Sequence, residues 1–181
     1  EVGLRRDAAA ALCALPGNGS GSVPSGPVVL VGRSLGTGVA VELAARGEGA
    51  FVILLSPYTS MVEMGRIVAG PLAWLLVADR FDSLSRAPRV KQPVVVLHGT
   101  RDEVIPFEQG RRLASAFPDA RFVPLEGRGH NDVFGQAELV AERDLPQVFG
   151  AARLDVNSPA AVAYGRYLRQ QQDLMLARIQ R

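Results

Sequence analysis

The chain is poor in cysteine, histidine and lysine. Cys13 is the single cysteine among 181 residues, so no intrachain disulfide can form, and its apolar helical surroundings indicate a small core residue. His98 and His130 are the two histidines, and no Cys/His cluster has metal-ligand spacing, so we expect neither a metal nor another cofactor. Lys91 is the single lysine, and a formal net charge of +2 with dispersed arginines predicts no nucleic-acid groove.

Long apolar runs are scarce as well. The longest, Ile67 to Ala78, is interrupted by Gly70-Pro71 and is too short to cross a bilayer. The first residues do not follow the pattern of a signal peptide, which predicts a cytoplasmic protein. The composition, 48% apolar and 21% charged, is typical of an ordinary globular domain.

Short apolar runs alternate with helical patterns along most of the chain. Runs that are apolar throughout are typical of strands buried on both faces, so the pattern predicts an α/β fold with a mostly parallel sheet and helices on both faces. The expected strands are Val28–Val31, Phe51–Leu55, Val94–Leu97 and Phe122–Leu125, and the expected helices are Val2–Leu15, Leu35–Arg46 and Phe107–Phe117.

A distinctive motif stands where the first apolar run ends. The run leads into Gly32-Arg33-Ser34-Leu35-Gly36 and then into a helical pattern, which is the G-x-S-x-G arrangement of a nucleophile elbow. Such a turn holds its serine in a strained backbone conformation, and we expect side chains at Gly32 and Gly36 to collide with the neighbouring strand and helix. The pattern makes Ser34 a candidate nucleophile.

Serine is a weak nucleophile that needs a histidine base, and the base needs an acid to orient it. His130 follows a strand-like stretch in a glycine-rich loop, where the base is expected, whereas His98 stands at the end of a strand and reads as structural. Asp102 lies between Ser34 and His130 in the sequence, in the order known for such elbows. Its neighbour Glu103 is the alternative, and either acid could instead be a solvated loop charge or a helix cap.

Three motifs together resemble the serine-hydrolase branch of the α/β-hydrolase superfamily: Gly32–Gly36, the run from His98 to Phe107, and the run from Gly127 to Asp132. With Ser56–Met61 and Asp79–Ser83 added, the chain is similar to the lineage of the protein depalmitoylases and their bacterial serine aminopeptidase-like relatives. The resemblance extends over roughly residues 4 to 135.

The resemblance implies a role for each motif residue. Ser34 would be the nucleophile, Asp102 the acid and His130 the base, and the backbone N–H of Leu35 would be one oxyanion donor. The implied activity is cleavage of a carboxylic ester or thioester, in a small-molecule or acylated substrate, through an acyl-enzyme. Amide or peptide cleavage by the same triad is an alternative, and so is a non-catalytic binding module of the same fold. The resemblance also leaves room for peripheral contact with a membrane.

Residues 57–90 read as an irregular, partly helical, cap-like excursion. The run Ile67–Ala78 within it is open to two interpretations: a cap over the active site that accepts an acyl chain, or a helix packed on or beside the sheet. Tyr58, Met61 and Met64 are candidates for the pocket, although such residues are more often core. In the cap interpretation, Leu72, Trp74, Leu75 and Leu76 would also line the pocket.

Several strands normally precede the elbow strand in this fold, and the resemblance places a second oxyanion donor after one of them. Here the residues before Val28 read as one helix and a Gly/Ser-rich connector, so we interpret the fold as truncated at its N-terminus, with a minimal variant as the alternative. The strand Val28–Val31 would then expose an apolar edge, which predicts self-association.

The rest of the chain is expected to complete one partial domain over residues 1–181. Asn157-Ser158-Pro159 has the pattern of a helix start, with a capping residue followed by proline in the first turn. We therefore expect a C-terminal helix over residues 157–180 that packs on the sheet. A helix that binds a partner or a membrane surface is the alternative.

Overall fold

The computed structural model describes residues 2–13, 28–70, 77 and 79–133. The chain divides into two compact units, Glu1–Phe134 and Gly135–Arg181, and the second unit lies outside the described residues. The helix expected over 157–180 and the single domain expected over 1–181 therefore stay predictions.

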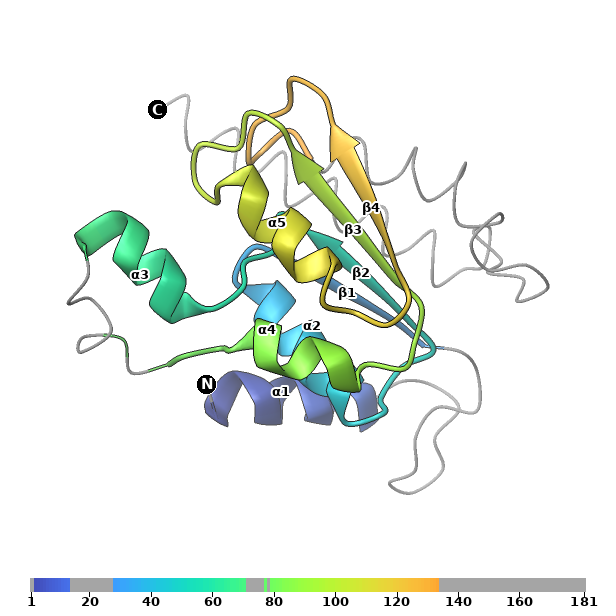
Figure 1. Cartoon of the computed structure of the whole chain (residues 1–181). Helices are drawn as coiled ribbons and strands as arrows, with labels where there is room; N and C mark the ends of the chain where they lie inside the picture. Colours follow the sequence, from blue (N-terminus) through green and yellow to red (C-terminus); the bar gives the residue numbers. More distant parts are fainter. Residues whose placement is uncertain (1, 14–27, 71–76, 78, 134–181) are drawn as a thin grey trace, which may run out of the picture. The chain divides into compact units, whose positions relative to one another are not determined.

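A parallel sheet forms the centre of the first unit (Figure 1). The strands follow one another in space in the order β1-β2-β3-β4, and every neighbouring pair is parallel, as predicted. Within the described residues β1 and β4 are the two edges; the self-association expected at Val28–Val31 stays a prediction. The strands are β1 (Val29–Arg33), β2 (Phe51–Leu55), β3 (Val94–Gly99) and β4 (Ala120–Leu125).

The predicted helices are present, with different bounds for α2, which spans Gly36–Ala45 rather than Leu35–Arg46, and for α5. Helix α1 ends at Cys13 in the described residues, and α5 ends at Ala114 rather than at Phe117. Beyond Ala114 the backbone tightens, because the N–H groups of Ala116 and Phe117 bond carbonyls three residues back instead of four. The helices are α1 (Val2–Cys13), α2 (Gly36–Ala45), α3 (Met61–Ala69), α4 (Ser83–Arg86), which continues into a 3₁₀ turn over Ala87–Arg89, and α5 (Phe107–Ala114).

The core lies between one face of the sheet and the helices α2 and α5. Alternate strand residues enter it, and Leu43 of α2 and Leu113 of α5 pack against them. The strand residues of the opposite face are buried too, so the expectation of strands buried on both faces is confirmed for β2 and β3. Burial of such a side chain stabilises the fold by about 1.5–3 kcal/mol. The strand residues of the core include Leu30, Val52, Leu54, Val94 and Val96; Leu55, Val95 and Leu97 lie on the other face.

Within the excursion between β2 and β3, two backbone hydrogen bonds join residues 59–61 to residues 80–84. The N–H of Met61 donates to the carbonyl of Arg80 (2.9 Å), and the N–H of Leu84 donates to the carbonyl of Thr59 (3.0 Å). Of the run Ile67–Ala78, the residues Leu72, Trp74, Leu75 and Leu76 lie outside the described part, so both interpretations of that run stay open. No helix among the described residues is both long and apolar enough to cross a membrane.

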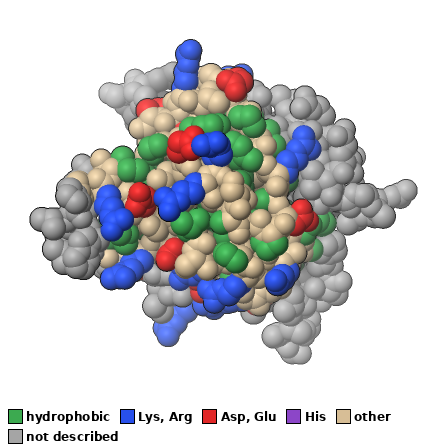
Figure 2. Space-filling model, in the orientation of Figure 1, with side chains coloured by type: hydrophobic (Ala, Val, Ile, Leu, Met, Phe, Trp, Pro, Cys, Tyr) green, Lys and Arg blue, Asp and Glu red, His purple; other side chains and the backbone are tan. Residues whose placement is uncertain are grey.

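On the surface, basic side chains alternate with other types. On the face drawn in Figure 2, arginine and lysine side chains of the described residues are separated by acidic and apolar ones. Large exposed apolar side chains occur singly along the described chain, at Leu4, Leu35, Ile67 and Val104.

Candidate active site

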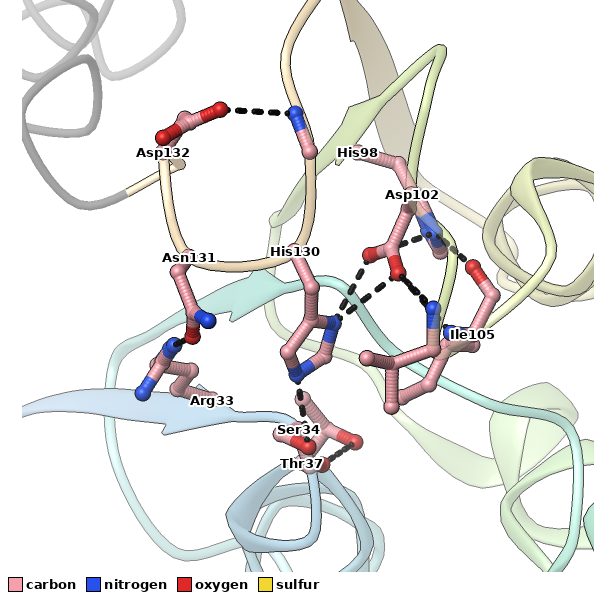
Figure 3. Close-up of polar contacts among 11 residues, drawn as sticks. Arg33, Ser34, Thr37, His98, Asp102, Ile105, His130, Asn131 and Asp132 are labelled. Carbon is pink, nitrogen blue, oxygen red and sulfur yellow. Dashed lines mark hydrogen bonds and ion pairs between the residues drawn. The ribbon is translucent and has the colours of Figure 1, made fainter. Parts of the chain in front are cut away.

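The candidate residues are collected at the carboxyl ends of three parallel strands. Ser34 directly follows β1, Asp102 lies in the loop after β3, and His130 lies in the loop after β4. In a parallel sheet these ends share one edge, which is where open α/β sheets place their sites. Figure 3 shows the three side chains converging there.

Ser34 occupies the strained turn that the motif predicts. Its φ is +48°, a left-handed conformation that is rare for a residue with a side chain. The turn is held from both sides: the Ser34 N–H donates to the carbonyl of Leu55 (2.9 Å), and the Thr37 hydroxyl donates to the carbonyl of Ser34 (2.6 Å). The surroundings therefore offset the cost of the strain and fix the direction of the serine side chain.

The two glycines of the motif have different surroundings. A Cβ at Gly32 would lie 2.7 Å from Thr37 Cα and 2.9 Å from Ala40 Cβ, so the predicted collision is present there. A Cβ at Gly36 would meet no atom within 4 Å in the described part, so the collision expected at Gly36 is wrong. Gly36 begins α2 and is exposed.

The Tyr58 side chain holds the backbone of Leu35 in place. Leu35 precedes the first turn of α2, where N–H groups have no partner within the helix, and its carbonyl accepts a hydrogen bond from the Tyr58 hydroxyl (3.2 Å). Tyr58 is 1% exposed and packs with Phe81 and Ile105, so it belongs to the core and supports the elbow rather than lining a pocket. Met61 and Met64, the other two pocket candidates, are partly buried against this cluster.

His130 bridges the other two residues of the site. Its Nε2 lies 3.1 Å from Ser34 Oγ, and its Nδ1 lies 3.0 and 2.9 Å from the two carboxylate oxygens of Asp102. An ionised carboxylate can only accept hydrogen bonds, so Nδ1 carries the ring proton and Nε2 presents its lone pair to the serine hydroxyl. Sequence reasoning left Glu103 as an alternative acid; the structure brings Asp102 to the histidine, whereas Glu103 is exposed.

Asp102 is surrounded by donors. Burial raises its pKa, but hydrogen bonds from His130, His98 and the backbone N–H of Ile105 together bring the pKa well below its ordinary value. The side chain is fully buried, and Oδ1 also accepts from the N–H groups of Val104 (3.0 Å) and Ile105 (2.8 Å). The carboxylate is therefore ionised at neutral pH, and its own loop fixes its orientation.

His98 proves to be a neighbour of the site, although its place in the sequence marked it only as structural. It is fully buried, and its Nε2 lies 2.9 Å from the Ile105 carbonyl and 3.4 Å from Asp102 Oδ2. Because a carbonyl only accepts, Nε2 carries the proton. The ring also packs edge-on against Phe107, with centroids 5.8 Å apart. The order of the motifs could exclude His98 as the base, but it gave no sign of this contact.

The loops that carry Asp102 and His130 are joined to each other. The N–H of Arg101 donates to the carbonyl of Arg128 (3.0 Å), and the N–H of Gly127 donates to the Thr100 hydroxyl (2.9 Å). The acid and the base therefore sit on one connected pair of loops.

A further contact joins the elbow to the loop after β4. Arg33 Nη2 donates to Asn131 Oδ1 (2.7 Å), although the two residues are 98 positions apart. Burial lowers the pKa of Arg33, and the nearby charge of Asp102 raises it in part. Sequence reasoning did not single out either residue. Among the described residues, no three His, Cys, Asp or Glu side chains come together as a metal site.

Comparisons with known proteins agree with this architecture. A family model described as TAP-like protein matches residues 73–143, a stretch that contains Asp102 and His130. An uncharacterized protein of Mycobacterium tuberculosis is 37% identical over 137 residues, which are 73% of this chain and 47% of that protein. The human alpha/beta hydrolase domain-containing protein 17C is 41% identical over 108 residues, which are 59% of this chain and 32% of that protein.

Solved structures share the fold at low sequence identity. Est1E of Butyrivibrio proteoclasticus, solved with ferulic acid, has a TM-score of 0.52 at 19% identity and covers 67% of this chain and 60% of its own. A thermophilic esterase of Thermogutta terrifontis has a TM-score of 0.51 at 19% identity, and the match covers 68% of this chain and 66% of the esterase chain. The chain belongs to the α/β-hydrolase superfamily. It spans at most about half the length of the curated relatives named here.

Proposed function

We propose that the chain is the catalytic part of a serine hydrolase that cleaves carboxylic esters or thioesters. The observation that carries the proposal is the bridge made by His130, which contacts Ser34 Oγ with Nε2 and both Asp102 oxygens with Nδ1. A lone pair aimed at a serine hydroxyl, with the opposite ring nitrogen held by a buried carboxylate, is the arrangement that activates a serine.

The proposed reaction proceeds through an acyl-enzyme. Ser34 Oγ attacks the carbonyl carbon while its proton moves to His130 Nε2, and the Leu35 N–H donates to the oxygen that becomes negative. His130 then gives the proton to the leaving alkoxide or thiolate as the carbon–oxygen or carbon–sulfur bond breaks. Water, losing a proton to the same nitrogen, attacks the acyl group; His130 then gives this proton to Ser34 Oγ as the bond to the acyl carbon breaks, which releases the acid and free Ser34.

Two observations support an acyl substrate. Leu35, directly after the nucleophile, and Val104, in the Asp102 loop, are large apolar side chains that are 46% and 51% exposed. The motifs around Ser34, Asp102 and His130 resemble those of depalmitoylases, which favours a thioester or ester with an apolar acyl chain. A cytoplasmic enzyme that contacts membranes at their surface fits this substrate class and is part of the proposal.

The proposal is tested by covalent labelling with a fluorophosphonate probe. We expect the 181-residue chain to be labelled, Ser34→Ala to lose the label, and Ser115→Ala, which changes an exposed serine of the α5 end, to keep it. Hydrolysis of p-nitrophenyl esters and acyl thioesters of increasing chain length then defines the acyl preference. A folded chain that takes no label, or a label that persists in Ser34→Ala, would overturn the proposal.

A further inference from the structure

Two neighbouring residues of the elbow face two neighbouring residues of the turn Gly129–Asp132, which we call the histidine turn. Ser34 Oγ lies 3.1 Å from His130 Nε2, and Arg33 Nη2 lies 2.7 Å from Asn131 Oδ1. Figure 3 draws both contacts, so two hydrogen bonds join the elbow to the turn. We propose that Arg33 and Asn131 are positioning residues of the hydrolase site, which hold the histidine turn at its working distance from Ser34.

The need for such a contact follows from how each part is anchored. Ser34 is fixed by its bonds to Leu55 and Thr37. The histidine turn is closed on itself by the bond from the Gly129 N–H to Asp132 Oδ2 (3.0 Å) and is tied to the Asp102 loop. These bonds set the place of His130 relative to Asp102, but they leave its distance to the serine to the packing between two separate loops.

The Arg33–Asn131 contact acts on that distance directly. Arg33 is the last residue of β1, and its backbone pairs with Leu55 of β2, so the guanidinium extends from a rigid base. A hydrogen bond from a charged donor is stronger than one between neutral groups. Because Asn131 directly follows His130, the bond restrains the segment that carries the base. Proton transfer from serine to histidine needs this geometry, and a misplacement of about 1 Å can cost about 10²-fold in rate.

A different role for Arg33 would leave a different signature. A guanidinium that binds an anionic part of the substrate would act without Asn131 and would change KM. A positioning contact requires both partners and changes the chemical step, so its loss lowers kcat at nearly constant KM. The two roles are therefore separable by kinetics. The inference rests on the proposed function for its kinetic test and on the structure alone for its exchange test.

The kinetic test compares Arg33→Met, Asn131→Leu and the double variant with the unchanged chain. We expect each single variant to lower kcat and the rate of fluorophosphonate labelling about tenfold, and the double variant to lose no more than the worse single one. Arg33→Lys keeps a cation and a donor and should recover most of the rate. Arg111→Met is the matched control, because Arg111 makes an exposed hydrogen bond to Glu108 within α5.

Unchanged labelling in both single variants, additive losses in the double variant, or a rise in KM confined to Arg33→Met would overturn the positioning role. Amide hydrogen exchange supplies a readout that does not depend on activity. We expect the amides of residues 129–133 to exchange faster in Arg33→Met, although the change is made about a hundred positions earlier in the chain. Unchanged exchange there refutes the contact's role, whereas a lack of labelling in the unchanged chain refutes the hydrolase itself.

Discussion

Replacing Asp102 by asparagine tests the proposed chemistry most sharply. The amide oxygen would stay where Oδ1 is, because the N–H groups of Val104 and Ile105 donate to that position at 3.0 and 2.8 Å. The amide NH₂ would then occupy the place of Oδ2, facing His130 Nδ1 and His98 Nε2. A donor at this place favours the His130 tautomer that carries its proton on Nε2, in competition with the amide oxygen at the Oδ1 position, which lies 3.0 Å from Nδ1. A protonated Nε2 cannot accept the proton of Ser34.

The expected loss can be stated as a rate and as an energy. The wrong ring tautomer lowers kcat by about 10⁴-fold in the Ser-His-Asp site of a serine protease. Four powers of ten correspond to about 5 kcal/mol of barrier height. The cost in folding stability is smaller, about 1–3 kcal/mol, because the two bonds from the loop backbone remain.

The assay measures kcat on a p-nitrophenyl ester, the rate of fluorophosphonate labelling, and unfolding by circular dichroism. Glu103→Gln is the control, since it removes the adjacent exposed acid and should keep activity within about twofold. An Asp102→Asn variant that folds and retains more than about a tenth of the rate would refute the assignment of the acid. So would an equal loss in Glu103→Gln.

Three further outcomes are expected. Gly32→Ala should lower the free energy of unfolding by about 1–3 kcal/mol, because its Cβ would overlap Thr37, whereas Gly36→Ala should leave it nearly unchanged; equal effects in denaturant titrations would contradict the reasoning. Folding lowers the pKa of Asp102, so its contribution to stability is complete above the ordinary aspartate pKa of about 3.9 and is lost as the pH falls further. In urea titrations at decreasing pH, the free energy of unfolding should therefore decline less for Asp102→Asn than for the unchanged chain. Tyr58→Phe removes one hydrogen bond to the carbonyl of Leu35 and leaves the one from the Gly38 N–H; it should lower kcat severalfold while costing about 1 kcal/mol of stability, and an unchanged kcat would show that the Tyr58 hydroxyl does not support the elbow.

The parts of the fold that follow local rules were predictable. The strand Phe51–Leu55 matches its prediction in full, because a short apolar run flanked by glycine and proline is typical of a buried strand. The elbow was predictable because the motif itself encodes a backbone conformation, and Ser34 indeed has φ +48°. The end of α5 was not predictable from the proline at position 118, since the helix tightens before reaching it.

Contacts between distant segments were beyond the reach of the sequence. Sequence order selected Ser34, Asp102 and His130 as a set, but it carried no information on the bond between Arg33 and Asn131. The approach of His98 to Asp102 arises because the loop after β3 turns back and brings the Ile105 carbonyl within 2.9 Å of His98 Nε2. These contacts depend on how loops pack, for which periodicity and residue type give no signal.

The closed ends of the excursion between β2 and β3 have a consequence for how this chain can vary. The backbone bonds from Met61 to Arg80 and from Leu84 to Thr59 hold the two ends together, and Ser34, Asp102 and His130 all lie outside the intervening residues. Changing the length of a segment whose ends already meet costs little, because loop-closure entropy grows only slowly with length. We therefore expect a change of length within residues 62–79 to leave the contacts of His130 with Ser34 and Asp102 in place.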